Sequence, residues 1–204
     1  MAVMGLQLFG VALLHGAEAG PVGRDATMLP FRDLAALVRP APYARIRCDD
    51  GELATYRRVI DAAFLHGAVL PAPCGTMFRT ADQVRLWMEQ NYIALSEGIH
   101  FVAGRCETRV HVTPQPTVVA EGTTTDFGAI AGETFRLLRR HAAAAVPVRG
   151  SGPEALSAAF LLQQEQWATF AEQVQQEAKR HPELRVEQTG PWPPYDFVRL
   201  DFGA

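Results

Sequence analysis

The segment TGPWPPYDF, residues 189–197, is the most distinctive stretch of this sequence, because three prolines and three aromatic residues occur within nine positions. Each proline fixes its own φ angle and removes a backbone N–H donor, so the segment is predicted to be rigid. Two roles are open for it. As a structural clamp, Trp192 and Tyr195 pack back onto the core; as a partner-binding anchor, they stay exposed and contact another protein. We favour the clamp, and the candidate residues are Trp192, Pro193, Pro194, Tyr195 and Phe197.

The residues before this segment predict alternating strands and helices. Residues 155–162 form a nearly continuous apolar run, which indicates a central strand. Residues 106–112 alternate in polarity, as a half-buried strand does. In the clearest helix, at 165–180, Trp167, Phe170 and Val174 recur at helical spacing and are expected to be buried. The other predicted elements are a helix at 128–142 with a face of Ile130, Thr134, Leu137, Leu138 and His141, a loop at 117–126, a turn at 146–153, and strands at 184–188 and 195–202.

The first half shows a looser mixture of the same elements. The apolar start, residues 1–14, predicts a buried first strand. A helix begins after Asp49, with Glu52 at the capping-box position, and ends at Gly67. A second helix begins after Thr80, with Gln83 three positions on, and ends at Gly98. Short strands are predicted at 34–38, 43–47 and 68–71, and a loop at 16–23.

These patterns predict an α/β (α+β) protein of two small domains. We place an N-terminal α/β domain at residues 1–103 and a C-terminal domain at residues 104–204. The order strand, helix, strand, helix, strand, strand in the second half is typical of a ferredoxin-like sheet with its helices on one face.

Charge and motifs exclude several function classes. The net charge is −3 and the calculated isoelectric point about 6.1, which argues against a nucleic-acid binder. The only lysine, Lys179, does not stand in the Gly-Lys-Ser/Thr context of a phosphate-binding loop. No HExxH or CxxC motif occurs. We therefore expect no catalytic, cofactor-binding or metal-binding residues, and no nucleic-acid or membrane partner.

The cysteines and the N-terminus indicate the compartment. Cys48, Cys74 and Cys106 are widely spaced and odd in number, so we expect three reduced thiols and no disulfide in a cytosolic protein. The apolar start carries no basic residue before Arg24, which a secretory signal peptide would need. A first strand is thus the preferred interpretation of this segment over secretion.

Several of these segments resemble the gas vesicle protein family GvpL/GvpF. Residues 6–11, LQLFGV, are similar to that family's first strand, and VLP at 69–71 with GTMF at 75–78 resembles its VLPLRFGTVF signature. Residues 107–112 stand where the family has a Glu-containing strand, and 189–197 resembles its TGPWPPYSF block. Two departures are Pro73-Cys74, where the family has Arg-Phe, and Tyr56, where it often has His.

The resemblance implies a non-enzymatic accessory protein of gas vesicle formation. Such a protein would bind the small apolar shell protein and other accessory proteins during assembly, in the cytoplasm and in association with the gas vesicle. It would hold or nucleate shell subunits without hydrolysing nucleotides and without a cofactor.

Two other function classes remain as alternatives. A small-molecule enzyme on a ferredoxin-like fold would show a deep pocket with converging His, Glu or Arg side chains. A small-ligand sensing module would show an enclosed apolar pocket and a symmetric dimer.

Overall fold

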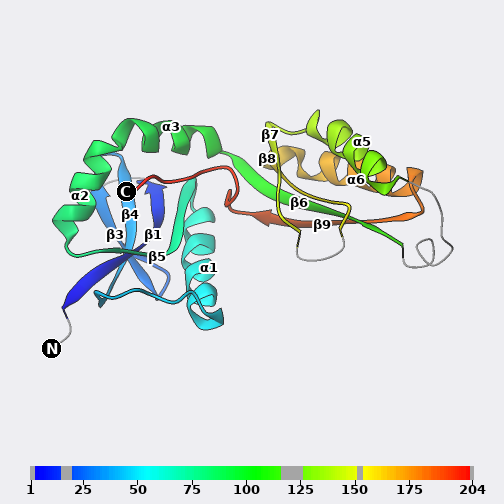
Figure 1. Ribbon diagram of the computed structural model, residues 1–204. Helices are drawn as coiled ribbons and strands as arrows, with labels where there is room; N and C mark the ends of the chain where they lie inside the picture. Colours follow the sequence, from blue (N-terminus) through cyan, green and yellow to red (C-terminus); the bar gives the residue numbers. More distant parts are fainter. Residues whose placement is uncertain (1–2, 15–19, 116–125, 151–153, 203–204) are drawn as a thin grey trace. The chain divides into compact units, whose positions relative to one another are not determined.

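The computed structural model describes residues 3–14, 20–115, 126–150 and 154–202, which include two antiparallel sheets flanked by helices (Figure 1). The α+β class predicted from the sequence is confirmed. The chain divides into two compact units, Met1–Gly104 together with Pro193–Ala204, and Arg105–Trp192. This division differs from the predicted one at the C-terminus, where the last residues belong to the first unit.

The first unit contains a five-stranded sheet in the order β2-β3-β4-β1-β5, with antiparallel neighbours. Strand β1, which lies between β4 and β5, confirms the predicted apolar first strand. The loop predicted at 16–23 includes β2. Strand β3 was not predicted, and it contains Pro30, a residue that is unusual inside strands. Proline is tolerated there because β2 is too short to pair with that part of β3. The strands are β1 (Met4–Leu13), β2 (Pro21–Val22), β3 (Ala26–Phe31), β4 (Leu34–Pro42) and β5 (Val69–Phe78).

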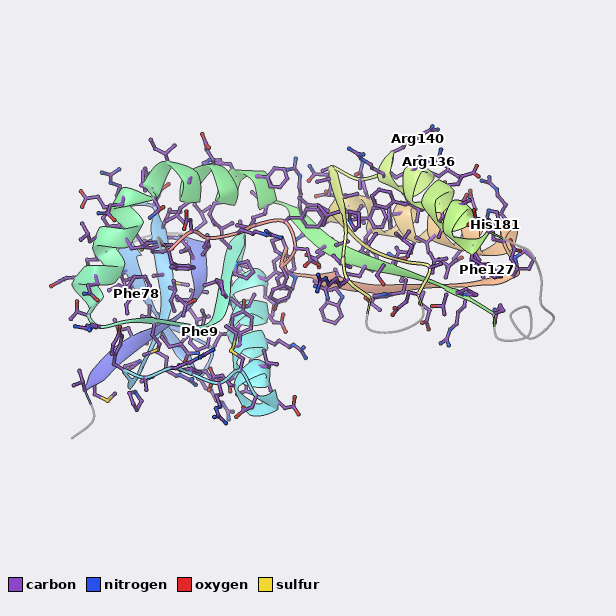
Figure 2. All side chains as sticks on the ribbon, viewed as in Figure 1. Phe9, Phe78, Phe127, Arg136, Arg140 and His181 are labelled. Atoms are coloured by element: carbon purple, nitrogen blue, oxygen red, sulfur yellow. A yellow bond between two sulfur atoms is a disulfide. The ribbon has the colours of Figure 1, made fainter. Side chains whose placement is uncertain are left out.

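Helices cover both faces of this sheet. On one face, Phe9 packs in a core with Tyr56, Val59 and Ile60 of α1 (Asp50–Phe64). On the other face, Leu8 packs in a core to which α2 (Ala81–Gln90) and α3 (Tyr92–Val102) contribute. The first unit is therefore a three-layer structure with the sheet in the middle (Figures 1 and 2). The residues from α2 and α3 in this core are Val84, Trp87, Met88, Leu95, Ile99 and Val102.

The predicted cap of α1 is confirmed, but the Glu52 side chain has a different role. The Asp49 carboxylate accepts a hydrogen bond from the Glu52 backbone N–H at 2.9 Å. Instead of returning to the cap, the Glu52 carboxylate accepts from Arg39 Nη2 at 3.1 Å, and Arg39 also donates to Gln7 Oε1 at 2.6 Å. Because Gln7 is fully buried in β1, this cluster ties α1 to the sheet.

The predicted single helix after Thr80 is two helices. The Thr80 cap is confirmed, since its hydroxyl accepts from the Gln83 N–H at 3.2 Å. The helix ends at Asn91, whose side-chain amide donates to the Trp87 carbonyl at 2.8 Å, and α3 begins at the next residue. The stop predicted at Gly98 is wrong. This glycine lies inside α3, where a Cβ would come within 3.1 Å of Leu70, so it serves close packing.

Two predicted strand boundaries in the first unit are also wrong. Residues 43–47 are not a strand, because β4 continues to Pro42 and the chain then turns toward α1. The strand predicted at 68–71 extends to Phe78 despite Pro71 and Pro73. It is an edge strand of the sheet, where missing N–H donors are tolerated.

The predicted absence of a disulfide is wrong. Cys48 and Cys74 are joined by a disulfide, with their Cα atoms 6.2 Å apart. The sequence separation of 26 residues gave no local signal of this pairing, which depends on how the chain between β4 and α1 passes β5. Cys106 is a free thiol, and its burial raises its pKa to about 11.

The second unit has the element order β-α-β-β-α-β, which is that of ferredoxin-like folds. Its strands form one antiparallel sheet in the order β7-β8-β6-β9. The predicted turn at 146–153 begins in fact within strand β7, and the predicted loop at 117–126 lies almost entirely outside the described residues. The elements are β6 (Arg105–Pro114), α5 (Phe127–Arg139), β7 (Ala144–Pro147), β8 (Leu156–Gln163), α6 (Trp167–Arg180) and β9 (Leu184–Trp192), with a 3-10 turn at Gln164–Gln166.

The core of this unit lies between the sheet and the two helices. Phe160 of β8 is fully buried, and its ring centroid lies 5.7 Å from that of Phe135 in α5 and 5.2 Å from that of Phe170 in α6. The predicted burial of Phe170 and Val174 is confirmed, whereas Trp167 is half-buried.

The predicted face of the third helix is partly wrong. Thr134 and Leu138 are buried as expected, together with Ala131, but His141 is exposed beyond the end of α5. Figure 2 shows Arg136 and Arg140 on the outer side of this helix, pointing away from the sheet. In the sequence of α5, the arginines therefore indicate the exposed face more reliably than the apolar residues indicate the buried face.

The strand predicted at 195–202 is wrong. After β9 the chain becomes irregular and packs on the first unit, where the Phe202 ring stacks on Trp87 at 4.9 Å. The Trp87 indole N–H also donates to the Asp201 carbonyl at 2.8 Å. The alternating apolar residues Val198, Leu200 and Phe202 therefore do not form a strand. They pack against the core that α2 and α3 cover.

Gly190 lies where β9 packs closely against β6. Its φ angle is +124°, and a Cβ at this position would lie 2.9 Å from the Glu107 carbonyl oxygen. We expect Gly190→Ala to lower the free energy of unfolding by about 1–3 kcal/mol, measured by urea denaturation. The control is Gly132→Ala in α5, where a Cβ meets no atom within 4 Å and should stabilise the helix by up to about 1 kcal/mol. Equal stability of the two variants would contradict this account.

Candidate partner-binding site

Trp192, at the end of β9, is the most exposed of the five predicted residues. Its side chain is 42% exposed, and its indole N–H donates to Thr189 Oγ1 at 3.3 Å. A Cβ at Gly190 would lie 3.1 Å from the Trp167 ring and 3.3 Å from the Trp192 ring, so both indoles flank this glycine. We call the half-buried Trp167 together with the exposed Pro191 and Trp192 the aromatic patch.

The aromatic patch lies on an edge of the second sheet. β9 has only β6 as a neighbour, with Trp192 opposite Glu107 in the register. Glu107 is fully buried and forms an ion pair with Arg109 at 3.0 Å. Rigid aromatic side chains beside a partly exposed arginine are the composition that protein–protein interfaces favour.

The other four predicted residues belong to the first unit and are more enclosed. Pro193 and Pro194 are buried, and Tyr195 and Phe197 are half-buried. Tyr195 packs on the core beneath α1, with its ring centroid 6.3 Å from that of Tyr56. Thus the structure brings Pro193 to Phe197 onto the body of the first unit and leaves Trp192 in the second.

Tyr56 supports this packing from α1. Its hydroxyl donates to the Ala72 carbonyl at 2.7 Å, and burial raises the pKa of Tyr56 well above its usual range. The Tyr56 hydroxyl therefore stays neutral and acts as a fixed hydrogen-bond donor between α1 and β5.

A second exposed surface in the first unit was not predicted. Leu86 and Ile93 on α2 and α3 are 53% and 74% exposed. Nearby, Arg32 has a left-handed backbone at φ 56°, and its guanidinium lies 4.4 Å from the Tyr92 ring centroid. Tyr92 donates to Asp33 Oδ1 at 2.6 Å, which raises its pKa. The only sequence signal for this cluster is the Arg-Asp pair at the turn between two apolar runs.

The described cavities are open rather than enclosed. One, of about 1030 Å³, lies beside the disulfide, and another of about 680 Å³ lies between α1 and the β2–β3 hairpin. Within the described ranges, no group of three or more His, Cys, Asp or Glu side chains could hold a metal ion. No helix in those ranges has the length and apolar character needed to cross a membrane.

Comparison with known proteins identifies the family. The family model of the gas vesicle synthesis protein GvpL/GvpF matches residues 6–133 and 118–199. This chain belongs to the GvpL/GvpF family. The chain is also 24% identical over 183 residues to gas vesicle protein F2 of Halobacterium salinarum, covering 88% of this chain and 82% of that protein.

Solved structures of the family share the fold. GvpF from Anabaena sp. PCC7120 matches with a TM-score of 0.80 at 17% identity, over 97% of this chain and 99% of that one. GvpF from Microcystis aeruginosa matches with a TM-score of 0.76 at 16% identity, over 96% and 99%. The segments that resembled the family in sequence lie in β1, β5 and β6, and in the end of β9 with the irregular chain that follows it to Phe197.

Proposed function

We propose that this chain is a non-enzymatic accessory protein of gas vesicle formation, which binds the small apolar shell protein and other accessory proteins during assembly. Membership of the GvpL/GvpF family is the observation that carries this proposal. In this role the protein works in the cytoplasm, in association with the vesicle, and keeps shell subunits from aggregating until they join the wall. The Cys48–Cys74 disulfide counts against the cytoplasmic part of this proposal, because cytosolic thiols are usually kept reduced. No nucleotide hydrolysis is part of the mechanism.

Two surface features support a binding role. The aromatic patch combines the exposed Trp192 ring and the half-buried Trp167 ring with an edge strand, and both features suit contact with an apolar partner. The described cavities, in contrast, are open and do not gather His, Glu and Arg side chains around one space, as the enzyme alternative would require.

We assign different roles to the two parts of the segment 189–197. Trp192 is the anchor for the partner, because its ring remains accessible. Pro193, Pro194, Tyr195 and Phe197 are the clamp that holds the end of the chain on the first unit, because they are enclosed. This assignment replaces our preference for Trp192 as a clamp.

Trp192→Ala tests the anchor. We expect the variant to keep its melting temperature within about 3 °C, because a partly exposed ring contributes little to the core. Capture of the purified shell protein should fall by about tenfold or more, as expected of a central aromatic contact. The measurement is a shell-protein pull-down and a thermal scan on the same preparation.

Leu65→Ala is the matched control, because it removes an 84% exposed apolar side chain from the first unit. It should bind the shell protein as the unchanged protein does. If Trp192→Ala loses stability and binding together, Trp192 belongs to the clamp. If the unchanged protein does not capture the shell protein at all, the proposed function is wrong.

A further inference from the structure

The Cys48–Cys74 disulfide joins two segments that differ in exposure. Cys48 lies in the exposed chain between β4 and α1, and we call residues 43–48 the tethered loop. Cys74 is half-buried in β5 and packs against the core beneath α1. A thiol in solution therefore reaches the Cys48 sulfur more easily than the Cys74 sulfur.

The disulfide is the main attachment of the tethered loop. At its start, the Tyr43 N–H donates to the Val3 carbonyl at 2.7 Å, and beyond its end Asp49 caps α1. Between these points, residues 44–47 make no hydrogen bond or ion pair with any described residue. Only Ile46 is partly enclosed. Breaking the disulfide would therefore free this stretch.

Gly75 allows the loop to lie close to β5. Its φ angle is +82°, and a Cβ here would lie 3.1 Å from the Ile46 carbonyl oxygen and 3.5 Å from Cys48 Sγ. The close approach thus depends on a residue without a side chain. Tyr43 is held by its hydrogen bond to Val3 and by the Arg79 guanidinium, 5.2 Å from its ring centroid, whereas the rest of the loop is held by this close approach and by one covalent bond.

An open cavity of about 1030 Å³ lies directly beside the two sulfurs. Arg45 and Arg47 line it, and neither forms an ion pair with a described residue. The one carboxylate in the lining, Asp49, accepts the Glu52 N–H and offsets one of the two arginine charges, which leaves a net positive charge. The cavity therefore offers room and positive charge to a small thiol that carries an anionic group.

We propose that Cys48–Cys74 is a thiol–disulfide exchange site for small anionic thiols, and that its reduction releases the tethered loop. The incoming thiolate attacks Cys48 Sγ, the S–S bond breaks, and Cys74 leaves as a thiolate that takes up a proton. A second thiolate attacks the external sulfur of the mixed disulfide and releases Cys48 in the same way. The protein disulfide gains two electrons, and two thiols become one external disulfide.

The first test compares two probe thiols on the oxidised full-length chain. These are 2-mercaptoethanesulfonate, which is anionic, and cysteamine, which is cationic, at equal thiolate concentration. After an acid quench and alkylation, peptide mass spectrometry locates the mixed disulfide and the freed thiols. We expect the adduct on Cys48, with the anionic probe about fivefold faster at low salt. This preference should disappear in 0.5 M salt and in the variant Arg45→Gln/Arg47→Gln.

Cys106 is the internal control for folding. It is buried, with a pKa raised to about 11, so it should stay unalkylated while Cys48 and Cys74 react. An adduct mainly on Cys74, equal rates for both probes, or reaction only together with Cys106 would each overturn the proposal.

The second test follows release of the loop by limited trypsin digestion. Arg45 and Arg47 are cleavage sites within the tethered loop. We expect cleavage there to become about tenfold faster on reduction, as local opening makes the backbone accessible. Cys48→Ser should be cleaved at the faster rate with or without thiol. Equal cleavage of the oxidised and reduced chains would show that the disulfide does not hold the loop.

Discussion

Replacing Phe160 with alanine should lower the free energy of unfolding of the second unit by about 3–5 kcal/mol. Phe160 has no exposed surface and lies on the central strand β8 between Phe135 of α5 and Phe170 of α6. Truncation removes the apolar contacts of a full ring and leaves a cavity that two helices and a sheet cannot close. We therefore expect the largest loss of any single truncation in this unit.

Urea denaturation followed by tryptophan fluorescence measures this loss, because Trp167 and Trp192 lie in the same unit. Leu86→Ala is the control, since it truncates a side chain that is 53% exposed in the first unit. It should change stability by less than about 0.5 kcal/mol. A loss below about 1 kcal/mol for Phe160→Ala would mean that the core relaxes around the cavity.

The elements predicted correctly from the sequence have strong local signals. The apolar run of β8, the alternation in β6 and the spacing of Phe170 and Val174 each fix a burial pattern within one element. Likewise the caps at Asp49 and Thr80 depend on residues three positions apart. Such signals need no knowledge of the rest of the fold.

The elements predicted incorrectly depend on distant residues. Gly98 reads as a helix stop until Leu70 is known to lie against it. Glu52 stands at the capping-box position in the sequence, but its carboxylate accepts hydrogen bonds from Arg39 and Gln7 instead. Residues 195–202 have the alternating pattern of a strand, but contacts of Trp87 with Asp201 and Phe202 fix them in an irregular conformation. In each case a tertiary contact decides between local alternatives that are close in energy.

The candidate site was predictable in its residues but not in its geometry. Proline density marked the segment 189–197 as rigid, and the structure encloses Pro193 and Pro194 while leaving Trp192 accessible. Which rings are covered depends on the core beneath α1, which no local pattern describes. The surface with Arg32 and Tyr92 was missed for the same reason, because its members come from a turn and a distant helix.

Reduction of the Cys48–Cys74 disulfide should destabilise the first unit by about 3 kcal/mol. The bond closes a loop with a sequence separation of 26 residues, and a cross-link over such a length restricts the unfolded chain by roughly this amount. The loop contains all of α1 and its core residues, so the restriction applies to the element that covers one face of the sheet. The melting temperature should fall by about 10 °C.

Differential scanning calorimetry of the oxidised and reduced chain measures this shift. The double variant Cys48→Ser/Cys74→Ser is the control: it should melt like the reduced chain and be insensitive to reductant. Cys106 is common to all samples and buried, so it should not contribute to the difference. A change of less than about 2 °C on reduction would mean that residual structure already restricts the unfolded chain without the cross-link.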